Sequence, residues 1–592
     1  MPRHLKSIQE LARIFFEFSY WHEMEQTPFK PRAYQLASES LTALDDEVRE
    51  TWRRGGIPAL MELPAIGQST AEKIDEYLRT GHIVEYDAIK RKFPVDIWGL
   101  SRIEGVGPRH IQDLYKHLKV KSVADLKRAL EAHKVRSIPR WGEKSEEKLA
   151  KGLALMNRSS GRRLLGEILP IADTIVTKLS LVPGVKHCLY AGSLRRRQET
   201  VGDIDLIATS SKPEAVMKAF VTMPLVETIH EQGKTRASVR LSIGIDADLR
   251  VVPDNVYGAT LQYFTGDKRH NVLLREFALS KGFTLNEYGL SRTKRKGSDH
   301  GKGSLVVCKT EEEIYKKLGM DTPPPEIRVG HDEIEAARKH TLPKLIPYGS
   351  LKGDLQVQTD WTDGHASIKE MACAAKAKGL SYMAVTDHTQ ALAFLGGLNE
   401  TKVKDQAKEI AKVNKEVRGF QILRGTECDV LKDGSLDLDD KTLATLDWVG
   451  ISIHSHFKLS RAAQTERLVK AMSNPNVDCI FHPTCRLIGK RDGIDLDMDE
   501  VTAAAKKYRV ALEVNAFPER SDLRDIHARA AIKAGVALVI NSDAHAVEHF
   551  GFLPLGVAIA RRGWATSKDV LNTKKLPSLL EYLDKKRKRH VS

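Results

Sequence analysis

Two aspartates separated by one residue are the strongest chemical signal in the chain. Asp203 and Asp205 stand in an apolar run, and in a strand this spacing puts both carboxylates on one face, about 7 Å apart. Because two buried like charges are costly without a cation, the pair indicates a divalent metal, with Mg²⁺ the expected ion. A strand-like run at residues 245–252 offers a third carboxylate, Asp246 or Asp248. Three such groups on neighbouring strands can hold two ions that clamp the attacking and leaving oxygens of a phosphoryl transfer.

A second group of metal-ligand residue types lies in the C-terminal part of the chain. Residues 346–592 alternate β-like runs with helical stretches, which predicts a β/α barrel. Barrel active sites form at the C-terminal strand ends, where the polar residues of these runs cluster. We therefore expect a metal site built from Asp363, His388, Glu427, His454, His482, Asp543 and His545.

Residues 1–160 read as short helices, within which one pattern recurs three times: an apolar residue, a tight glycine turn, and a short helix that begins with polar residues. The pattern resembles the helix-hairpin-helix module, whose backbone N–H groups approach a DNA phosphate without reading sequence. Ala65 and Arg140 stand where the first and third copies should have their first glycine, so phosphate contacts are less secure there. The glycines expected at DNA are Gly67, Gly105, Gly107 and Gly142.

The chain has 592 residues and a formal net charge of +15. At about 150 residues per domain this length predicts roughly four domains, and 41% apolar residues exclude the disordered and low-complexity classes. Residues 1–345 carry a net charge of +10, and residues 585–589 supply the +5 of the remainder. A basic surface favours phosphate polyanions, whereas solubility is the alternative explanation. We expect salt-sensitive DNA affinity that resides mainly before residue 345.

The start of the chain and the cysteines bear on the compartment. Glu17 interrupts the first apolar run, so no signal peptide is expected, and no window of about 18 uninterrupted apolar residues could span a bilayer. The six cysteines are scattered without a CxxC pair, which favours reduced thiols. We expect a cytoplasmic protein without a membrane partner.

The segment at residues 192–205, Gly-Ser-Leu-Arg-Arg-Arg-Gln-Glu-Thr-Val-Gly-Asp-Ile-Asp, resembles the palm motif of the family X DNA polymerases, the group that includes DNA polymerase beta. The resemblance continues through residues 263–271 and Arg275, and with the helix-hairpin-helix region it covers roughly the first 318 residues. It implies that Asp203 and Asp205 bind two Mg²⁺ or Mn²⁺ ions. Asp248, with Asp246 as the alternative, would complete the catalytic ion and help to activate the primer 3′-hydroxyl.

The same resemblance implies roles for residues around these aspartates. Phosphates of the incoming nucleotide would be held by Gly192, Ser193, Arg196 and Gly202. An aromatic turn that excludes a ribose 2′-hydroxyl would line the sugar pocket with Tyr263, Phe264 and Gly266, and the minor groove of the base pair would be approached by Asn271 and Arg275.

Residues 1–82 are similar to the small lyase domain of the same family, whose nucleophilic lysine forms a Schiff base with an abasic sugar. Lys73 falls on that position, but Ser69 replaces a supporting lysine of the animal enzymes. A solvated lysine that at most contacts phosphate is the alternative, and the sequence leaves lyase activity open.

Residues 346–592 resemble the PHP (polymerase and histidinol phosphatase) phosphoesterase domain, which follows the polymerase core in bacterial family X enzymes. That resemblance implies that the seven C-terminal residues named above, with two histidines of a first-strand His-x-His motif, bind three metals for 3′–5′ exonuclease and abasic-site cleavage. Gln356 and Gln358 stand where those histidines belong, and an amide is a poor ligand for a metal that prefers imidazole. We therefore expect an incomplete Zn²⁺ or Mn²⁺ site, a weakened or lost nuclease, and a domain kept partly for folding or DNA placement.

Together these features predict a multidomain α+β protein that acts as a template-directed, gap-filling DNA polymerase in base excision repair. The expected partners are gapped or nicked duplex DNA and deoxynucleoside triphosphates, bound by a monomer. A phosphoesterase delivered to DNA by the N-terminal region and a non-catalytic DNA-binding scaffold are the alternatives. The expected domains are a lyase-like helical domain at 1–82, a helix-hairpin-helix domain at 83–160, a nucleotidyltransferase palm at 161–255, a thumb at 256–318, a linker at 319–345, a distorted β/α barrel of PHP type at 346–584 and a basic tail at 585–592.

Overall fold

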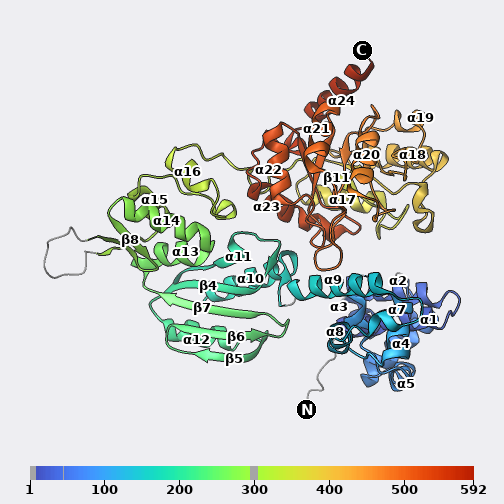
Figure 1. The fold of residues 1–592 in the computed structure, drawn as a ribbon, viewed down its shortest axis with the longest axis horizontal. Coiled ribbons are helices and arrows are strands. Elements are labelled where there is room, and N and C mark those ends of the chain that lie inside the picture. The colour runs from blue at the N-terminus through green and yellow to red at the C-terminus, as the bar shows by residue number, and fades with distance from the viewer. Residues whose placement is uncertain are drawn as a thin grey trace. The chain divides into compact units, whose positions relative to one another are not determined.

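The structure is a computed structural model that describes residues 8–293, except 45, 64, 104 and 160, and residues 305–591. The chain divides into two compact units, one over Met1–Ser160 with Gly489–Arg491 and another over Gly161–Ile488 and Asp492–Ser592 (Figure 1). Within the described residues, no helix is both long enough and apolar enough to cross a membrane.

The first unit is helical, as the sequence predicts. Its helices are α1 (Ile8–Met24), α2 (Lys30–Leu44), α3 (Asp46–Leu60), α4 (Gln68–Thr80), α5 (Val84–Lys92), α6 (Ile97–Ser101), α7 (Pro108–Leu118), α8 (Val123–Glu131), the 3₁₀ turn η1 (Val135–Ser137) and α9 (Glu143–Ser159). Leu11, Phe15 and Phe18 lie at helical spacing on α1 and are buried against α2 and α4. A second core, which includes Leu100 and Leu114, gathers α6 to α9. The unit therefore contains two small helical cores.

A five-stranded mixed sheet in the order β2-β4-β7-β6-β5 occupies the segment predicted to be the palm, and that name is kept for it below. Helices α10 and α12 bury Leu206 and Leu249, so one face of the sheet is apolar. Because side chains alternate along a strand, the aspartates of β4 and β7 must point to the other face. The elements are β1 (Arg163–Leu164), α10 (Leu165–Ser180), β2 (Val185–Tyr190), α11 (Gly192–Arg195), β3 (Thr200–Val201), β4 (Asp203–Ser210), α12 (Pro213–Val221), β5 (Val226–Gln232), β6 (Arg236–Leu241) and β7 (Asp246–Val252).

The thumb is a helical subdomain with a small antiparallel sheet in the order β10-β9-β8. Its elements are η2 (Asp254–Val256), α13 (Tyr257–Thr265), α14 (Lys268–Ser280), β8 (Phe283–Asn286), β9 (Gly289–Arg292), β10 (Leu305–Val306), α15 (Glu311–Lys317), η3 (Pro325–Ile327) and α16 (Glu333–Arg338). The prediction of a separate linker at 319–345 is wrong for much of this segment. Arg328 is buried with its Nη1 2.5 Å from Oε1 of Glu311, and Glu333 lies 2.8 Å from the buried His270. Ion pairs and apolar side chains of α16 therefore fasten the segment to the thumb.

Seven parallel strands, β11 to β17 in sequence order, form the C-terminal sheet, and the predicted alternation of β-like runs with helical stretches is confirmed. The sheet closes toward a barrel because the N–H of Gln358 donates to the carbonyl of Ala544 at 2.8 Å, beside the bridge of Val357 to Ala544. Strands and helices alternate: β11 (Gly353–Val357), α17 (Ile368–Ala377), β12 (Tyr382–Val385), η4 (Gln390–Leu395), α18 (Glu400–Glu416), β13 (Gln421–Asp429), α19 (Asp440–Leu443), β14 (Trp448–Ser452), α20 (Arg461–Met472), β15 (Cys479–Ile480), α21 (Met498–Tyr508), β16 (Ala511–Asn515), α22 (Asp525–Ala534), β17 (Leu538–Asn541), η5 (Val547–Phe552), α23 (Leu553–Arg562), η6 (Leu571–Thr573) and α24 (Leu576–Val591).

The basic run near the C-terminus belongs to α24, which corrects the prediction of a separate tail at 585–592. Lys586 is 1% exposed, and its Nζ lies 2.9 Å from Oδ1 of the buried Asp478. Arg587 approaches the same carboxylate at 3.2 Å. These two cations neutralise a buried charge of the barrel, and they are not a free site for polyanions. No disulfide joins any of the six cysteines, all of which lie within the described residues.

Candidate active sites

Parallel pairing of β4 with β7 brings three aspartates together on the polar face of the palm sheet. The register sets Asp205 beside Asp248 and Asp203 beside Asp246. Asp246 is engaged elsewhere, because its Oδ1 lies 2.9 Å from Nη1 of Arg240. Asp203, Asp205 and Asp248 are therefore the candidate metal ligands.

Burial and like charge act together on these carboxylates. Burial, followed by the charges of Asp203 and Asp248, raises the pKa of Asp205 to about 6. Burial and Asp248 also raise the pKa of Asp203, while the charges of Arg250 and Arg196 offset only part of the effect at Asp205. The residues therefore fit divalent cations, which would remove the repulsion.

The loop after β2 approaches the carboxylates because Gly192 has no side chain. Gly192 has a φ of +59°, and a Cβ atom there would lie 2.5 Å from Oδ2 of Asp205. Gly192 and Ser193 begin α11, and Arg196 caps its C-terminus while donating to a backbone carbonyl at the end of α13. At the other end of the loop, Gly202 leads directly into β4. The four expected phosphate-binding residues thus flank the aspartates.

The predicted sugar and base-pair residues lie around one turn between α13 and α14. The rings of Tyr263 and Phe264 stand edge to face, with centroids 5.3 Å apart, and Gly266 takes a φ of +63°. Asn271 fixes the turn by donating from Nδ2 to the carbonyl of Tyr263 at 2.8 Å. Arg275 lies one helical turn further on, with Nε 3.3 Å from the carbonyl of Asn271.

All three glycine turns of the first unit are formed. The turn residues at helix starts are Gly67 before α4, Gly107 before α7 and Gly142 before α9. Gly105 has a φ of +85°, and Ala65 and Arg140 take φ values of 59° and 70° in the equivalent places. Non-glycine residues pay about 1–2 kcal/mol for this left-handed conformation. The substituted copies therefore keep the turn geometry despite its strain.

Lys73 lies on α4 beside an acidic partner. Its Nζ is 3.0 Å from Oε2 of Glu85 and 3.2 Å from Oγ of Ser69, and it stands 5.9 Å from the centre of the Tyr34 ring. Burial alone would lower the pKa of Lys73, but Glu85 and Tyr34 outweigh it and raise that pKa above the usual value. The amine is therefore held in its protonated, non-nucleophilic form.

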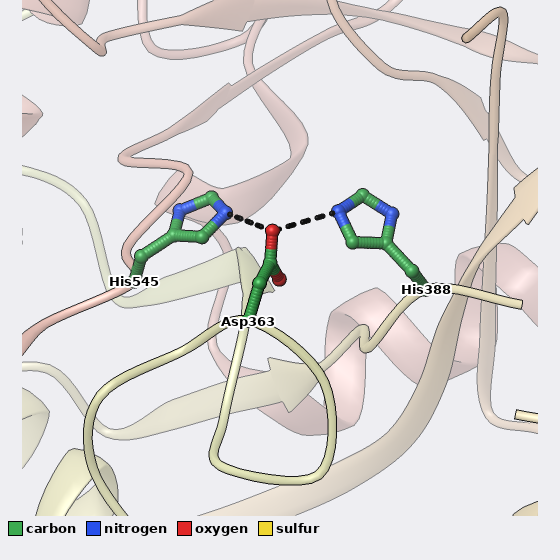
Figure 2. A group of neighbouring side chains, drawn as sticks. All are labelled: Asp363, His388 and His545. Carbon is green, nitrogen blue, oxygen red and sulfur yellow. Dashed lines mark ion pairs between the residues drawn. The ribbon is translucent and has the colours of Figure 1, made fainter. Parts of the chain in front are cut away.

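Three of the predicted PHP residues converge at one end of the barrel. Figure 2 shows Asp363, on the loop after β11, between His388 after β12 and His545 after β17. One carboxylate oxygen of Asp363 lies 3.5 Å from Nε2 of each histidine. Burial would raise the pKa of Asp363, but the two histidines hold it below the usual value. The mixed nitrogen and oxygen donors suit a transition metal such as Zn²⁺ or Mn²⁺.

A second group surrounds the buried Glu427. Nε2 of His454 lies 3.3 Å and Nε2 of His482 lies 2.8 Å from its Oε1, while Nδ1 of His388 is 3.7 Å from Oε2. Burial opposes ionisation, but the histidines hold the pKa of Glu427 well below its usual value. Nδ1 of His388 and Nε2 of His454 are buried without a hydrogen-bond partner in the described structure, as expected of metal ligands. Six of the seven predicted residues thus form two adjoining groups.

Gln356 in β11 and Gln358 directly after that strand occupy the remaining side of Glu427. Gln356 and Gln358 donate from Nε2 to Oε2 of Glu427 at 3.2 and 2.7 Å. Oε1 of Gln356 accepts from Asn515 at 3.1 Å, and the same Asn515 nitrogen lies 3.1 Å from Oδ2 of Asp543. The amide nitrogens of both glutamines thus point toward the Glu427 carboxylate, which would have to hold a metal on this side. The part of the site beside Gln356 and Gln358 therefore does not fit an ion.

Several contributing residues were not predicted. Asp429 lies 3.1 Å from Nδ1 of His454, which leaves Nε2 of that ring free for a ligand role. Arg520 lies 3.1 Å from Asp543 and neutralises it. Asn515 is the last residue of β16, so the available sequence signal was a polar residue at the end of a β-like run. Asp429 has the same signal at the end of β13, whereas nothing in the local sequence singles out Arg520.

Comparison with known proteins identifies the family. A DNA polymerase/3′-5′ exonuclease PolX of Bacillus subtilis (strain 168) is 37% identical over 578 residues, which cover 97% of this chain and 99% of that protein. The chain belongs to the family X DNA polymerases that carry a C-terminal PHP domain. Four family profiles match it: helix-hairpin-helix domain at residues 8–83, SAM-like helix-hairpin-helix tandem at 99–154, DNA polymerase beta thumb at 260–329 and PHP domain at 354–517.

Two further relatives each match one part of this family X chain. DNA polymerase lambda of Rattus norvegicus is 26% identical over 282 residues, 44% of this chain and 46% of that protein. A probable phosphatase of Thermoanaerobacter sp. (strain X514) is 29% identical over 243 residues, 38% of this chain and 93% of that protein.

Substitution of Asp205 by asparagine tests the strain in the palm carboxylates. The folded chain keeps a proton on Asp205 between its ordinary pKa of 3.8 and about 6, where the unfolded chain has lost it, so stability falls as pH rises through this window. In EDTA at pH 8, Asp205→Asn should therefore be more stable by up to about 3 kcal/mol. The gain should shrink as the pH is lowered from about 6 to about 4.

Urea unfolding across this pH range measures the difference, and added Mg²⁺ should stabilise the wild type more than the variant. Equal stability of the two proteins in EDTA at pH 8 would contradict the electrostatic account.

Proposed function

We propose that this family X chain is a template-directed DNA polymerase that fills gaps in duplex DNA during base excision repair. The observation that carries the proposal is the parallel register of β4 and β7, which gathers Asp203, Asp205 and Asp248 beside the Gly192 loop. Two divalent cations held by these carboxylates, Mg²⁺ or Mn²⁺, would stabilise charge on the attacking and leaving oxygens.

The chain's own groups supply orientation and proton handling. Asp248 lies next to Asp205 and is the group expected to assist removal of the proton from the primer 3′-hydroxyl. Gly192, Ser193, Arg196 and Gly202 would hold the triphosphate, because backbone N–H groups and a guanidinium are suited to phosphate oxygens. At the C-terminal end of α13, Tyr263 and Phe264 would exclude a ribose 2′-hydroxyl, while Asn271 and Arg275 of α14 would approach the base pair.

DNA would be held through the three glycine turns of the first unit, whose backbone N–H groups can approach phosphates without reading sequence. Such contacts make affinity fall with added salt. We further propose a monomer that works in the cytoplasm. The cytoplasmic assignment is supported by the lack of disulfides among the six described cysteines and by the bacterial relative.

Primer extension on a gapped duplex tests the carboxylate assignment. Asp205→Ala and Asp248→Ala should each reduce synthesis at least about 1,000-fold, since each removes charge from the ion-binding face. Asp246→Ala is the matched control, because Asp246 lies on the same strand but is paired with Arg240. It should retain most of the wild-type rate.

The alternatives give different results. Unchanged synthesis by Asp205→Ala would overturn the polymerase assignment, and a wild type without synthesis but with strong DNA cleavage would favour a phosphoesterase delivered to DNA. DNA binding with neither reaction would favour a scaffold.

We propose that the PHP nuclease is weakened, because Gln356 and Gln358 turn amide donors toward Glu427 in place of metal ligands. The groups around Asp363 and His454 still fit a metal, with His388 common to both. A site that lacks one of its positions would bind metal but support little hydrolysis.

Degradation of a 3′ end in the presence of Mn²⁺ tests this proposal. The wild type should be nearly inactive, and Gln356→His with Gln358→His should raise activity at least about tenfold while increasing bound metal per chain. Robust wild-type degradation that is lost in His454→Ala or Asp543→Ala would show instead that the site is complete without imidazoles at these positions.

Lyase activity is proposed to be slow because Glu85 holds Lys73 protonated. Borohydride trapping on a 5′-terminal abasic site should give a weak adduct that Lys73→Ala removes. Glu85→Gln should increase trapping severalfold, since each unit of pKa lowered gives about a tenfold larger fraction of free amine. Efficient trapping by the wild type with no gain in Glu85→Gln would contradict this account.

A further inference from the structure

Two arginines of the PHP barrel hold the loop that leads to the polymerase carboxylates. Glu199 lies in the palm, four residues before Asp203. Nη1 and Nη2 of Arg486 lie 3.0 and 2.8 Å from the two carboxylate oxygens of Glu199, which is a bidentate pair. Arg562 at the end of α23 lies 3.4 Å from the same carboxylate and donates to the carbonyl of Arg197. Arg486 and Arg562, which are far apart in sequence, thus both bind the loop that contains Arg197 and Glu199.

The ion pairs of Glu199 with Arg486 and Arg562 are largely shielded from water, and each arginine is held in place by further hydrogen bonds within the barrel. The exposed fractions of the side chains are 12% for Arg486, 20% for Glu199 and 1% for Arg562. Nε of Arg486 donates to the carbonyl of Arg520 at 2.9 Å, and Nε of Arg562 donates to Oδ2 of Asp525 at 2.8 Å. Each guanidinium is therefore already oriented by its own domain before it meets the palm.

Apolar packing closes the same contact. A Cβ atom on Gly166 would lie 2.7 Å from Pro518 and 3.1 Å from Leu555, so the start of α10 touches the barrel directly. Leu555 is 8% exposed and packs into the apolar core of the palm. The N–H of Leu165 in turn donates to the carbonyl of Glu199 at 2.9 Å. Movement of the loop away from the barrel would break these contacts together.

We infer that Arg486 and Arg562 are positioning residues for nucleotidyl transfer. By fixing Glu199 they set the path of residues 192–202, which carry the proposed triphosphate contacts and lead directly into Asp203. The inference rests on the proposed polymerase function. It gives the barrel a part in nucleotide binding that does not depend on a complete metal site at Gln356 and Gln358.

Steady-state filling of a one-nucleotide gap by the full chain tests the inference. Arg486→Ala and Arg562→Ala should each raise the KM for the incoming deoxynucleotide about tenfold, with kcat changed less than about threefold, because the loop positions phosphates that are bound before the reaction as well as during it. Affinity for gapped DNA should stay within about twofold.

Arg561→Ala is the matched control. Arg561 is the neighbouring residue of α23, its Nε lies 2.8 Å from Glu326, and its side chain is 15% exposed. Its loss removes a comparable ion pair without contacting the loop, so KM should remain within about twofold of the wild type. A general loss of stability would affect Arg561→Ala as well, and a rise in KM there equal to that of Arg486→Ala would overturn the inference.

A double-mutant cycle supplies the second readout. Glu199→Gln should raise KM by itself, and Glu199→Gln combined with Arg486→Ala should be little worse than the more affected single variant. If Arg486→Ala does not fold, Glu199→Gln carries the test, since it removes the charge and leaves the barrel intact.

A KM for folded Arg486→Ala or Glu199→Gln within about twofold of the wild type would overturn the inference, as would strictly additive effects. Failure of the proposed function is distinguishable, because the wild type itself would then lack synthesis that Asp205→Ala abolishes.

Discussion

The polymerase site depends on the repulsion among Asp203, Asp205 and Asp248. The cationic side chains of the palm offset this repulsion only in part. Helices α10 and α12 need an apolar face on β4 and β7, so alternation sends every aspartate of these strands to the opposite face. Parallel pairing then sets Asp205 beside Asp248, and burial adds to their repulsion. Gly192 brings backbone close to this charge where a Cβ atom would collide with Asp205. The sheet is therefore assembled at an electrostatic cost that bound cations would relieve.

The PHP site solves the same problem in a different way. Glu427 is surrounded by imidazoles and by the amide nitrogens of Gln356 and Gln358, and Asp543 is paired with Arg520. In the barrel, hydrogen-bond donors and cations of the chain thus neutralise the buried carboxylates. In the palm, the buried carboxylates have other carboxylates as neighbours. This difference is why the palm requires cations for its charge balance, whereas part of the barrel site is already balanced by the chain.

Local sequence patterns predicted the strands and helices and the candidate residues of each site. They did not predict which charged side chains form ion pairs with residues of other elements. The strands followed from β-like runs, and the Asp-x-Asp spacing followed from alternation. The choice of Asp248 over Asp246 depends on Arg240, a neighbour on β6 that makes an ion pair with Asp246. Charge counts likewise placed Lys586 in a free tail, because a count cannot reveal that Asp478 is buried opposite it. Tertiary contacts, which have no local signature, decided these cases.

The contact of Arg486 with Glu199 also has no local sequence signature, because the two residues are 287 positions apart in the chain. The inferred positioning role would give the barrel a structural part in the polymerase even where its metal site is incomplete. The positions of Arg486 and Arg562 depend on β15, α23 and the apolar core beneath them, which is built from buried aliphatic side chains. Gln356 and Gln358 even contribute hydrogen bonds to the barrel interior that a metal ligand would have to give up. Loss of a metal position and firm support of the palm are therefore compatible within one domain, because they draw on different parts of its structure.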